Sequence, residues 1–321
     1  MKAIRMHATG GPEVLALDEV DTPTPAAGEI LIKIAAAGVN YADLMQRQGV
    51  YPPPHEPPLI LGVEAAGTVT ALGPGVSAPA IGDRVVAFVD GGYAEYAVAA
   101  AGQAVLIPDA LGFPEATALL VQGLTAYGLL RDAARLGPDE TVLVHAAAGG
   151  VGSLAVQVAR LLGAGLVIGT AGADDKVARA RDLGVDQALS YAADDWEARV
   201  RDVTGGRGAD VILDAVGGVV GARSLALLAP FGRLVIFGAA SGEPTPVVGQ
   251  QLIPLNQTII GYTLQGQPPD RRAAATATLL ESVAAGRLRI DTGDTFPLAE
   301  AAAAHHAIAA RRTTGKVALI I

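Results

Sequence analysis

The chain contains no cysteine among its 321 residues. This absence excludes disulfides, a thiolate nucleophile, thiolate-ligated zinc and cysteine-ligated iron–sulfur clusters. A metal would have to be held by histidines and carboxylates, and the five histidines are not spaced as a ligand set. We therefore expect no metal site, and we interpret each histidine as a solvent-facing or interdomain residue.

Charged residues are also scarce, at 17% of the chain, and the formal net charge is −9. Lysine and arginine form no block longer than a pair, so the clustered cations that neutralise nucleic-acid phosphates are missing. No apolar stretch reaches the roughly 20 residues of a membrane helix. The first residues, Met1–Glu13, lack the apolar core of a signal peptide. We expect a cytoplasmic protein that binds neither nucleic acid nor membrane.

The length allows two domains, and the first part of the chain consists of short β segments broken by glycine and proline. One proline run lies around Pro52–Pro58, and one short helix is expected from Tyr41 to Gly49. The expected strands are Lys2–His7, Val14–Val20, Glu29–Ala36, Glu64–Ala71, Arg84–Val89 and Ala94–Val98. This pattern predicts an antiparallel, barrel-like or sandwich-like domain.

After Pro114 the pattern changes to a long helix, Glu115–Ala134, followed by alternating strands and helices. The expected strands are Thr141–Ala146, Leu166–Thr170, Ala188–Tyr191, Val211–Ala215, Leu234–Gly238 and Ile259–Leu264, with helices Val151–Leu162, Lys176–Leu183 and Trp196–Val203 between them. Continuous apolar strands alternating with amphipathic helices predict a doubly wound parallel sheet, covered on both faces. From about Arg271 we expect a helix, a loop, the helix Leu298–Arg311 and the strand Lys316–Ile320, which returns to the first domain.

The most informative segment is the glycine-rich turn between the strand ending at His145 and the following helix. It contains Ala148, Gly149, Gly150, Val151 and Gly152. Small residues let the backbone approach a pyrophosphate, and the helix N-terminus offers unpaired N–H groups and partial positive charge. The strand before and the helix after are the context that a dinucleotide-binding fingerprint requires. The alternative is a glycine-rich turn in another kind of α/β protein. A P-loop is excluded because no Gly-Lys-Ser/Thr follows the turn, and a nucleophile elbow is excluded because the chain has no Gly-x-Ser-x-Gly motif.

The expected cofactor is NADPH rather than NADH. An NAD-specific fold places a carboxylate about 20 residues after the glycines, but Ala171 stands 19 residues after Gly152. Lys176 and Tyr191 could instead reach a 2′-phosphate. We interpret Asp174 and Asp175 as the cap of the helix that carries Lys176. From spacing alone, Lys176 is equally consistent with a solvated helix residue.

These motifs resemble the zinc-lacking quinone oxidoreductases, the zeta-crystallin-like group of the medium-chain dehydrogenase/reductase superfamily. The matching segments are Gly38–Asp43, Arg47 with Gly49, Tyr51–Pro52, Gly62–Gly67, Gly82–Val85, Gly91–Tyr96, Leu124–Tyr127, Asp139–Glu140, Gly149–Gly152 with Gln157 and Arg160, Asp210–Gly217, Phe237–Gly238 and Gly315–Lys316. The resemblance implies an α/β enzyme with a GroES-like, β-rich catalytic domain, expected at 1–122 and 265–321, and a doubly wound Rossmann domain at 123–264. Zinc-dependent relatives carry a cysteine at the position of Asn40 and a histidine at that of Val63, so the resemblance accounts for the lack of zinc ligands.

The resemblance also implies roles for particular residues. Asn40 and Tyr41 are expected near the nicotinamide, with Phe237 and Gly238 on its other side. Thr125 is expected at the carboxamide, Lys176 and Tyr191 at the 2′-phosphate, and Gly172 among the cofactor contacts. The family commonly dimerises through Rossmann edge strands, here near Thr258–Leu264, so a homodimer is expected.

Without a metal to polarise a simple ketone, the plausible acceptors are electron-poor quinones or alkenes conjugated to a carbonyl. Asn40 would hydrogen-bond the acceptor oxygen, and Tyr41 or Tyr51 would relay a proton from water. Alternatively, Asn40 caps the helix that begins at Tyr41, and the tyrosines only line a pocket. Two other functions remain open: a 2-enoyl thioester reductase, and a nucleotide-binding protein with little catalysis.

Overall fold

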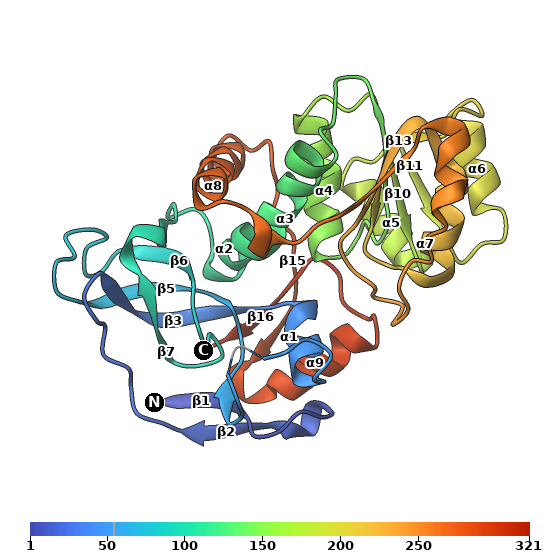
Figure 1. Ribbon diagram of the computed structural model, residues 1–321. Helices are drawn as coiled ribbons and strands as arrows, with labels where there is room; N and C mark the ends of the chain where they lie inside the picture. Colours follow the sequence, from blue (N-terminus) through green and yellow to red (C-terminus); the bar gives the residue numbers. More distant parts are fainter. Residues whose placement is uncertain (54) are drawn as a thin grey trace. The chain divides into compact units, whose positions relative to one another are not determined.

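The computed structural model describes residues 1–53 and 55–321, so Pro54 of the proline run lies outside the described residues. The chain forms two compact units, Met1–Val121 with Ile290–Ile321, and Gln122–Arg289 (Figure 1). The second unit ends 25 residues beyond the expected boundary at 264, because α8 (Pro269–Ala284) packs against α3 (Leu124–Gly128) of that unit.

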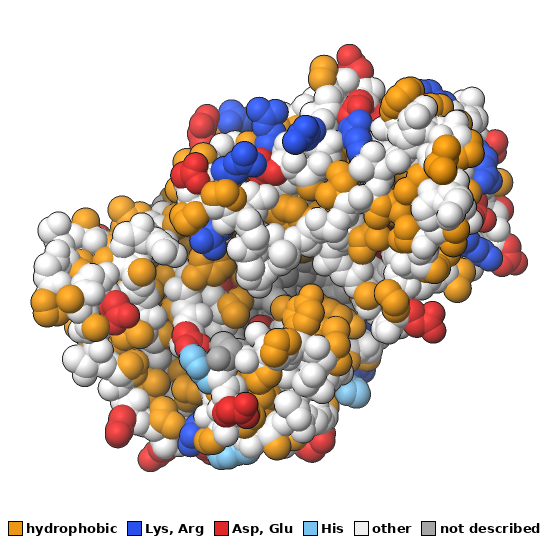
Figure 2. Space-filling model, in the orientation of Figure 1, with side chains coloured by type: hydrophobic (Ala, Val, Ile, Leu, Met, Phe, Trp, Pro, Cys, Tyr) orange, Lys and Arg blue, Asp and Glu red, His pale blue; other side chains and the backbone are white. Residues whose placement is uncertain are grey.

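The visible surface mixes hydrophobic side chains with charges of both signs (Figure 2). Over residues 1–53 and 55–321, no helix is both long and apolar enough to cross a membrane.

The first unit is built around β3 (Glu29–Val39), which pairs with three other strands. The main sheet has the order β15-β16-β3-β5-β6-β8, with β7 also paired to β3, and a smaller antiparallel sheet has the order β2-β1-β4. The remaining bounds are β1 Lys2–Met6, β2 Leu15–Glu19, β4 Leu59–Ile60, β5 Glu64–Leu72, β6 Arg84–Phe88, β7 Tyr96–Ala100, β8 Val105–Leu106, β15 Thr292–Pro297 and β16 Lys316–Ile320, with helices α1 Tyr41–Arg47, α2 Phe113–Ala118 and α9 Ala301–Ala309. The terminal strand β16 pairs antiparallel with β3, which confirms its expected return to the first domain.

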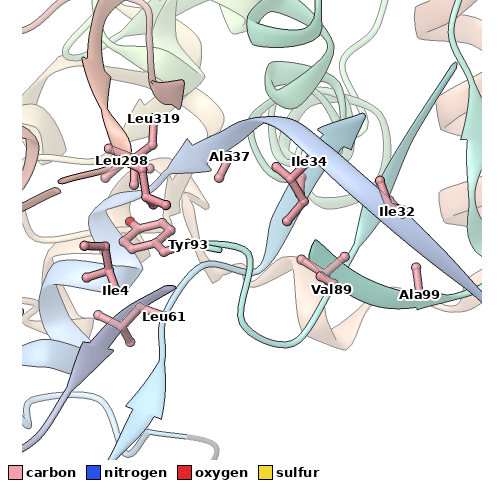
Figure 3. Packing of buried hydrophobic residues seen from close by; sticks show 14 of the residues in the cluster. Ile4, Ile32, Ile34, Ala37, Leu61, Val89, Tyr93, Ala99, Leu298 and Leu319 are labelled. Carbon is pink, nitrogen blue, oxygen red and sulfur yellow. The ribbon is translucent and has the colours of Figure 1, made fainter. Parts of the chain in front are cut away.

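Alternation along β3 creates the core of this unit. Ile30, Ile32 and Ile34 are buried while Lys33 between them is exposed, as the period of two in a strand requires. Figure 3 shows Ile32 and Ile34 on this strand and the ring of Tyr93 near Ile4, all of them members of one buried cluster.

The second unit contains a six-stranded sheet whose strand pairs are all parallel, in the order β11-β10-β9-β12-β13-β14. Numbered from β9, this is the order 3-2-1-4-5-6 of a Rossmann sheet. The bounds are β9 Thr141–Val144, β10 Leu166–Ala171, β11 Gln187–Ser190, β12 Ala209–Asp214, β13 Leu228–Ile236 and β14 Thr258–Gly261, with helices α4 Gly150–Leu161, α5 Asp174–Asp182, α6 Trp196–Val203 and α7 Gly218–Ser224. All six residues of β12 are buried, as expected for a central strand covered on both faces. The predicted fold class is confirmed.

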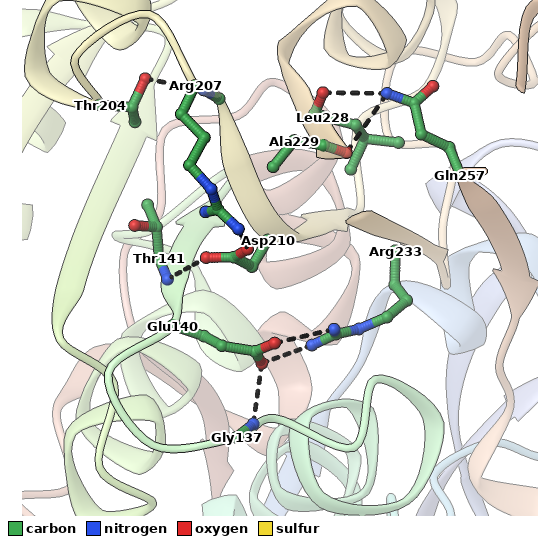
Figure 4. A network of polar contacts seen from close by, with 11 residues as sticks. Gly137, Glu140, Thr141, Thr204, Arg207, Asp210, Leu228, Ala229, Arg233 and Gln257 are labelled. Atoms are coloured by element: carbon green, nitrogen blue, oxygen red, sulfur yellow. Dashed lines mark hydrogen bonds and ion pairs between the residues drawn. The ribbon is translucent and has the colours of Figure 1, made fainter. Parts of the chain in front are cut away.

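An ion-pair network ties the amino ends of the central strands together (Figure 4). Arg233 of β13 holds the Glu140 carboxylate through two hydrogen bonds of 2.9 and 2.5 Å. Asp210 of β12 accepts the Thr141 N–H of β9 at 2.9 Å and pairs with Arg207. Burial acts to raise the pKa of Glu140, but the hydrogen bonds from Arg233 and the Gly137 N–H outweigh it and hold that pKa below its usual value.

Three sequence predictions differ from the structure. The helix expected over Glu115–Ala134 is interrupted by wider π-helical turns at Leu119–Gly123 and Leu129–Ala133. The loop expected before the last helix contains β15, whose Thr292–Pro297 sequence has little apolar alternation. Helix α7 was not expected, because its glycines at 218 and 221 hide the helical pattern.

Candidate functional site

The predicted cofactor residues of the second unit gather at the carboxyl ends of the parallel strands. The turn after β9 carries Ala148 to Gly152, the segment after β10 carries Gly172 and Lys176, Tyr191 follows β11, and Phe237 and Gly238 follow β13. The strand order changes direction between β9 and β12, and this edge of such a sheet is where ligands bind.

The turn after β9 is shaped to bring helix α4 close to the strand. A Cβ on Gly152 would overlap the carbonyl oxygen of Ala146 and lie 2.9 Å from the Cα of Ala147. These are backbone atoms that cannot rotate away, so glycine at 152 is a steric requirement. The Ala147 N–H is bonded to the Thr170 carbonyl of β10 at 2.9 Å, and α4 starts at Gly150 with an extended N-cap at Gly149. The first N–H groups of a 12-residue helix are thus presented at the end of the sheet.

Gln122, in the π-helical segment Leu119–Gly123, contacts this turn, and the sequence interpretation missed it. Its side-chain amide lies against Gly150, where an added Cβ would overlap Nε2 and lie 2.6 Å from Oε1. The residue is 8% exposed, and its Oε1 has no hydrogen-bond partner within the described chain. A buried acceptor without a partner beside a helix N-terminus fits a ligand that carries hydroxyl or amide donors, such as the ribose of a dinucleotide. The glycine at position 150 was the only feature of the sequence that could have indicated that another side chain approaches this turn.

The prediction that each histidine is solvent-facing or interdomain is wrong for His145, which is fully buried at the end of β9. Its Nδ1 lies 2.7 Å from Thr170 Oγ1 and its Nε2 lies 2.7 Å from Ser224 Oγ. Because the Ser224 hydroxyl donates to the Val220 carbonyl, it accepts from Nε2–H, and Nδ1 accepts from Thr170. Burial lowers the pKa of His145 to about 4, so this imidazole is neutral near neutral pH. Its ring also meets that of Tyr191 edge to face, with centroids 6.4 Å apart.

Tyr191 directly follows β11, and Lys176 lies in the first turn of α5, the helix after the neighbouring strand β10. The ring of Tyr191 covers Gly172, where an added Cβ would lie 3.1 Å from the phenolic oxygen. The interpretation of Asp174 and Asp175 as a cap is wrong: Ala173 is the N-cap of α5, and both aspartates lie in its first turn with Lys176. No carboxylate occupies the end of β10, which continues into Gly172.

Phe237 and Gly238 lie on a loop held against the end of β12. The Phe237 N–H donates to the Asp214 carbonyl at 3.0 Å, and a Cβ on Gly238 would lie 3.1 Å from the Ala215 carbonyl oxygen. The buried Asp214 carboxylate accepts the N–H groups of Val216 and Gly217 and so fixes the loop after β12. Thr125 lies on α3 and is 9% exposed.

Asn40, Tyr41 and Tyr51 belong to the first unit. Asn40 is 5% exposed, whereas Tyr41 is 39% and Tyr51 is 54% exposed. Asn40 occupies the N-cap position of α1, where its backbone N–H donates to Asp43 Oδ2 at 2.8 Å. Asn40 and Asp43 form a capping box at this end of α1. The Asn40 side chain also contacts Glu64 and Lys316, with Nδ2 2.8 Å from Glu64 Oε1 and Oδ1 3.1 Å from Lys316 Nζ. Asn40 is therefore the cap of α1, as the alternative interpretation expected, but capping alone does not account for the contacts of its amide with Glu64 and Lys316.

A second buried polar group lies beside α1. Asp43 accepts the hydroxyl of Tyr93 at 2.8 Å, and His305 Nε2 lies 3.1 Å from the same hydroxyl. Burial raises the pKa of Asp43 to about 6 and lowers that of His305 to about 3. His305 is fully buried, so its interpretation as a solvent-facing or interdomain residue is also wrong.

No group of three or more His, Cys, Asp and Glu side chains suited to a metal ion occurs in the described part of the chain.

Comparisons with known proteins agree with this architecture. Residues 26–109 match the family of the alcohol dehydrogenase GroES-like domain, and residues 150–281 match the zinc-binding dehydrogenase family. Together, the GroES-like unit and the parallel sheet with its glycine turn define a medium-chain dehydrogenase/reductase.

Similarity to individual relatives identifies the family within this superfamily. The chain is 40% identical to a quinone oxidoreductase of Salmonella typhimurium, covering 99% of this chain and 98% of the relative. It is 34% identical to a 2-haloacrylate reductase of a Burkholderia species, covering 98% and 97%. A solved structure of Escherichia coli quinone oxidoreductase in complex with NADPH superposes with a TM-score of 0.93 at 37% identity, covering 100% of both chains. The chain belongs to the quinone oxidoreductase family of this superfamily.

Proposed function

We propose that the protein is an NADPH-dependent reductase that transfers a hydride to a quinone. The observation that carries this proposal is the carboxyl edge of the parallel sheet, where the glycine turn follows β9, the first turn of α5 with Lys176 comes after β10, and Tyr191 follows β11. Bound NADPH supplies the hydride, so that quinone, NADPH and one proton become hydroquinone and NADP⁺. Relatives in this family are named for quinone reduction, and one was solved with NADPH bound.

The cofactor site is proposed from backbone shape and from charge. The first N–H groups of α4 would bind the pyrophosphate, with Ala148, Gly149 and Val151 of the turn around it. Gly150 and Gly152 let Gln122 and the Ala146 carbonyl approach. Gly172, Phe237, Gly238 and Thr125 would complete the contacts to the cofactor.

NADPH is favoured over NADH by the end of β10. A 2′-hydroxyl is held by a carboxylate at that strand end, and here the strand leads into Gly172. Lys176 would balance the charge of a 2′-phosphate, and the Tyr191 hydroxyl would donate to it.

Acceptor reduction is assigned to the Asn40 region. The Asn40 amide would donate to the acceptor oxygen, which gains negative charge as the hydride arrives. Tyr41 and Tyr51 are both exposed, so either hydroxyl could exchange its proton with water and pass one on. An Asn40→Ala variant should therefore bind NADPH normally and turn over slowly.

The decisive experiment follows NADPH oxidation by absorbance with an ortho-quinone, a para-quinone, an enone and crotonyl-CoA in parallel, with NADH as the cofactor control. We expect quinone-dependent oxidation of NADPH and little of NADH. Turnover of crotonyl-CoA alone would replace the proposal with a 2-enoyl thioester reductase. Binding of NADPH without turnover of any acceptor would leave a nucleotide-binding protein.

A conjugated alkene is the second candidate acceptor. One relative is named for reduction of a haloacrylate, in which the alkene is conjugated to a carboxylate. Enone turnover at least equal to quinone turnover would favour this acceptor class.

A homodimer through the edge strand of the Rossmann sheet is proposed on the same basis. β14 is the last strand in the order and pairs with β13 on one side. Its other edge carries backbone groups that a second copy could pair, and the half-buried Ile259 and Ile260 would be covered by that pairing.

A further inference from the structure

Asn40, Glu64 and Lys316 form a closed ring of hydrogen bonds inside the first unit. Lys316 Nζ lies 2.5 Å from Glu64 Oε1 and 3.1 Å from Asn40 Oδ1, and Asn40 Nδ2 lies 2.8 Å from the same Glu64 oxygen. The other carboxylate oxygen of Glu64 accepts the N–H of Val121 at 2.8 Å. The Lys316 and Glu64 side chains are both 0% exposed.

The strand register places these three residues side by side. On β3, Ala37 is opposite Ala65 of β5 and Val39 is opposite Val317 of β16. Glu64, Lys316 and Asn40 are each one residue beyond these pairs, at the same end of three adjacent strands.

Gly38 provides the space that the ring occupies. An added Cβ there would overlap Glu64 Oε1 and lie 2.6 Å from Lys316 Nζ. Because Gly38 does not have a left-handed φ, glycine is needed here for space and not for backbone conformation.

The chemistry of the ring fixes the orientation of the Asn40 amide. An ammonium can only donate and a carboxylate can only accept, so Oδ1 must face Lys316 and Nδ2 must face Glu64. Glu64 takes one of the two amide hydrogens, and no second acceptor for Nδ2 lies among residues 1–53 and 55–321. The amide is therefore locked with one N–H group available to a ligand.

A buried ion pair is expensive in free energy, because both charges lose their hydration. The position of this ion pair beside Asn40 has a chemical consequence. An ammonium that donates a hydrogen bond to an amide oxygen draws electron density from the amide and makes the amide N–H a stronger donor. We infer that Lys316 and Glu64 are positioning residues that orient and polarise the Asn40 amide toward the acceptor oxygen. This inference rests on the proposed function, in which Asn40 binds the acceptor.

No proton or electron moves within the ring. The proton that completes the reduced acceptor comes from solvent. The ring acts by keeping the Asn40 donor in place before the hydride arrives, which is the condition for electrostatic preorganisation.

The test uses the doubly neutral variant Lys316→Met with Glu64→Gln in the full chain. Replacing Lys316 alone would leave a buried, unpaired carboxylate and would destabilise the fold, whereas the double variant removes both charges. The glutamine introduced at position 64 keeps only one of the two acceptor oxygens that serve Asn40 and Val121, so we expect the double variant to fold with a lowered temperature of thermal unfolding. We expect an unchanged Kd for NADPH and a kcat for quinone lower by about ten-fold or more.

Adding Asn40→Ala to the wild type and to the double variant shows whether Lys316 and Glu64 affect kcat through Asn40. If the ring acts through Asn40, this change lowers kcat strongly in the wild type and little in the double variant. An unchanged kcat in the double variant, or an equal loss from Asn40→Ala in both backgrounds, would overturn the inference.

A readout independent of turnover separates this inference from the proposed function. In ¹⁵N NMR spectra, the Nδ2 hydrogens of Asn40 should be widely separated in shift in the wild type, and should converge in the double variant. Converged signals in the wild type would overturn the ring itself. Wild-type protein that shows separated signals but reduces no quinone would refute the proposed function and, with it, a role in quinone reduction, while leaving the geometry established.

Discussion

Replacing Gly152 by alanine tests the phosphate turn without involving the acceptor. The added Cβ would lie 2.9 Å from two backbone atoms, while ordinary contact begins at 3.4 Å. Helix α4 would therefore have to retreat from the turn by at least about 0.5 Å. Overpacking of this kind costs about 1–3 kcal/mol of stability.

The same retreat moves the first N–H groups of α4 away from the position where we propose that they bind the pyrophosphate. A hydrogen bond to a charged group contributes about 1.5–3 kcal/mol, so the loss of one such bond weakens binding by roughly ten- to a hundred-fold. Because the pyrophosphate is common to both cofactors, Gly152→Ala should weaken NADPH and NADH by the same factor. Fluorescence titration of the purified protein measures both Kd values.

Gly249→Ala is the matched control. Gly249 belongs to the same unit, has no neighbouring atom within 4 Å of an added Cβ and does not require a left-handed φ. Its thermal unfolding and both Kd values should match those of the wild type. The steric argument would be refuted if Gly152→Ala bound NADPH within about two-fold of the wild type.

Three further predictions concern other parts of the molecule. Lys176→Gln should raise the Kd for NADPH by about ten-fold and leave that for NADH unchanged, since only NADPH carries the 2′-phosphate; equal effects on both would refute the assignment. Burial lowers the pKa of His145 from 6.5 to about 4 in the folded state. Its contribution to stability is therefore complete above pH 6.5 and is lost as the pH falls toward 4. Urea unfolding should show a loss of about 2 kcal/mol between about pH 7 and about pH 5, and His145→Gln should not show this loss. Ile260→Lys at the exposed edge of the sheet should convert a dimer to a monomer in sedimentation velocity, whereas an unchanged dimer would place the interface elsewhere.

The sequence predicted the parts of the fold that depend on local pattern. The parallel sheet and the glycine turn before α4 depend on residues that are adjacent in sequence, such as the apolar run of β12, so the sequence predicted both. The helix expected over Glu115–Ala134 has the right composition, but its π-helical interruptions depend on tertiary packing, which composition does not encode.

The candidate site was predicted less completely, because several of its contacts join distant segments. Lys316 and Asn40 are 276 residues apart in sequence, and His145 and Ser224 are 79 apart. A buried histidine with two hydroxyl partners cannot be distinguished from an exposed one by its neighbours in sequence. Asp43 and Arg47 stand at helical spacing, a pattern shared by surface pairs, yet both are buried, and Asp43 accepts hydrogen bonds from Asn40 and Tyr93.

Four glycines indicate how such distant contacts could be found. Gly38, Gly150, Gly152 and Gly172 all lack a left-handed φ, so conformational freedom does not explain them. An added Cβ at each would meet Lys316 and Glu64, Gln122, the turn backbone and the Tyr191 ring respectively. In each case glycine stands where another group of the candidate site must come close. In this chain, a glycine without a left-handed φ is evidence of proximity where an added Cβ would clash, and the side chain it would meet is the one to substitute first.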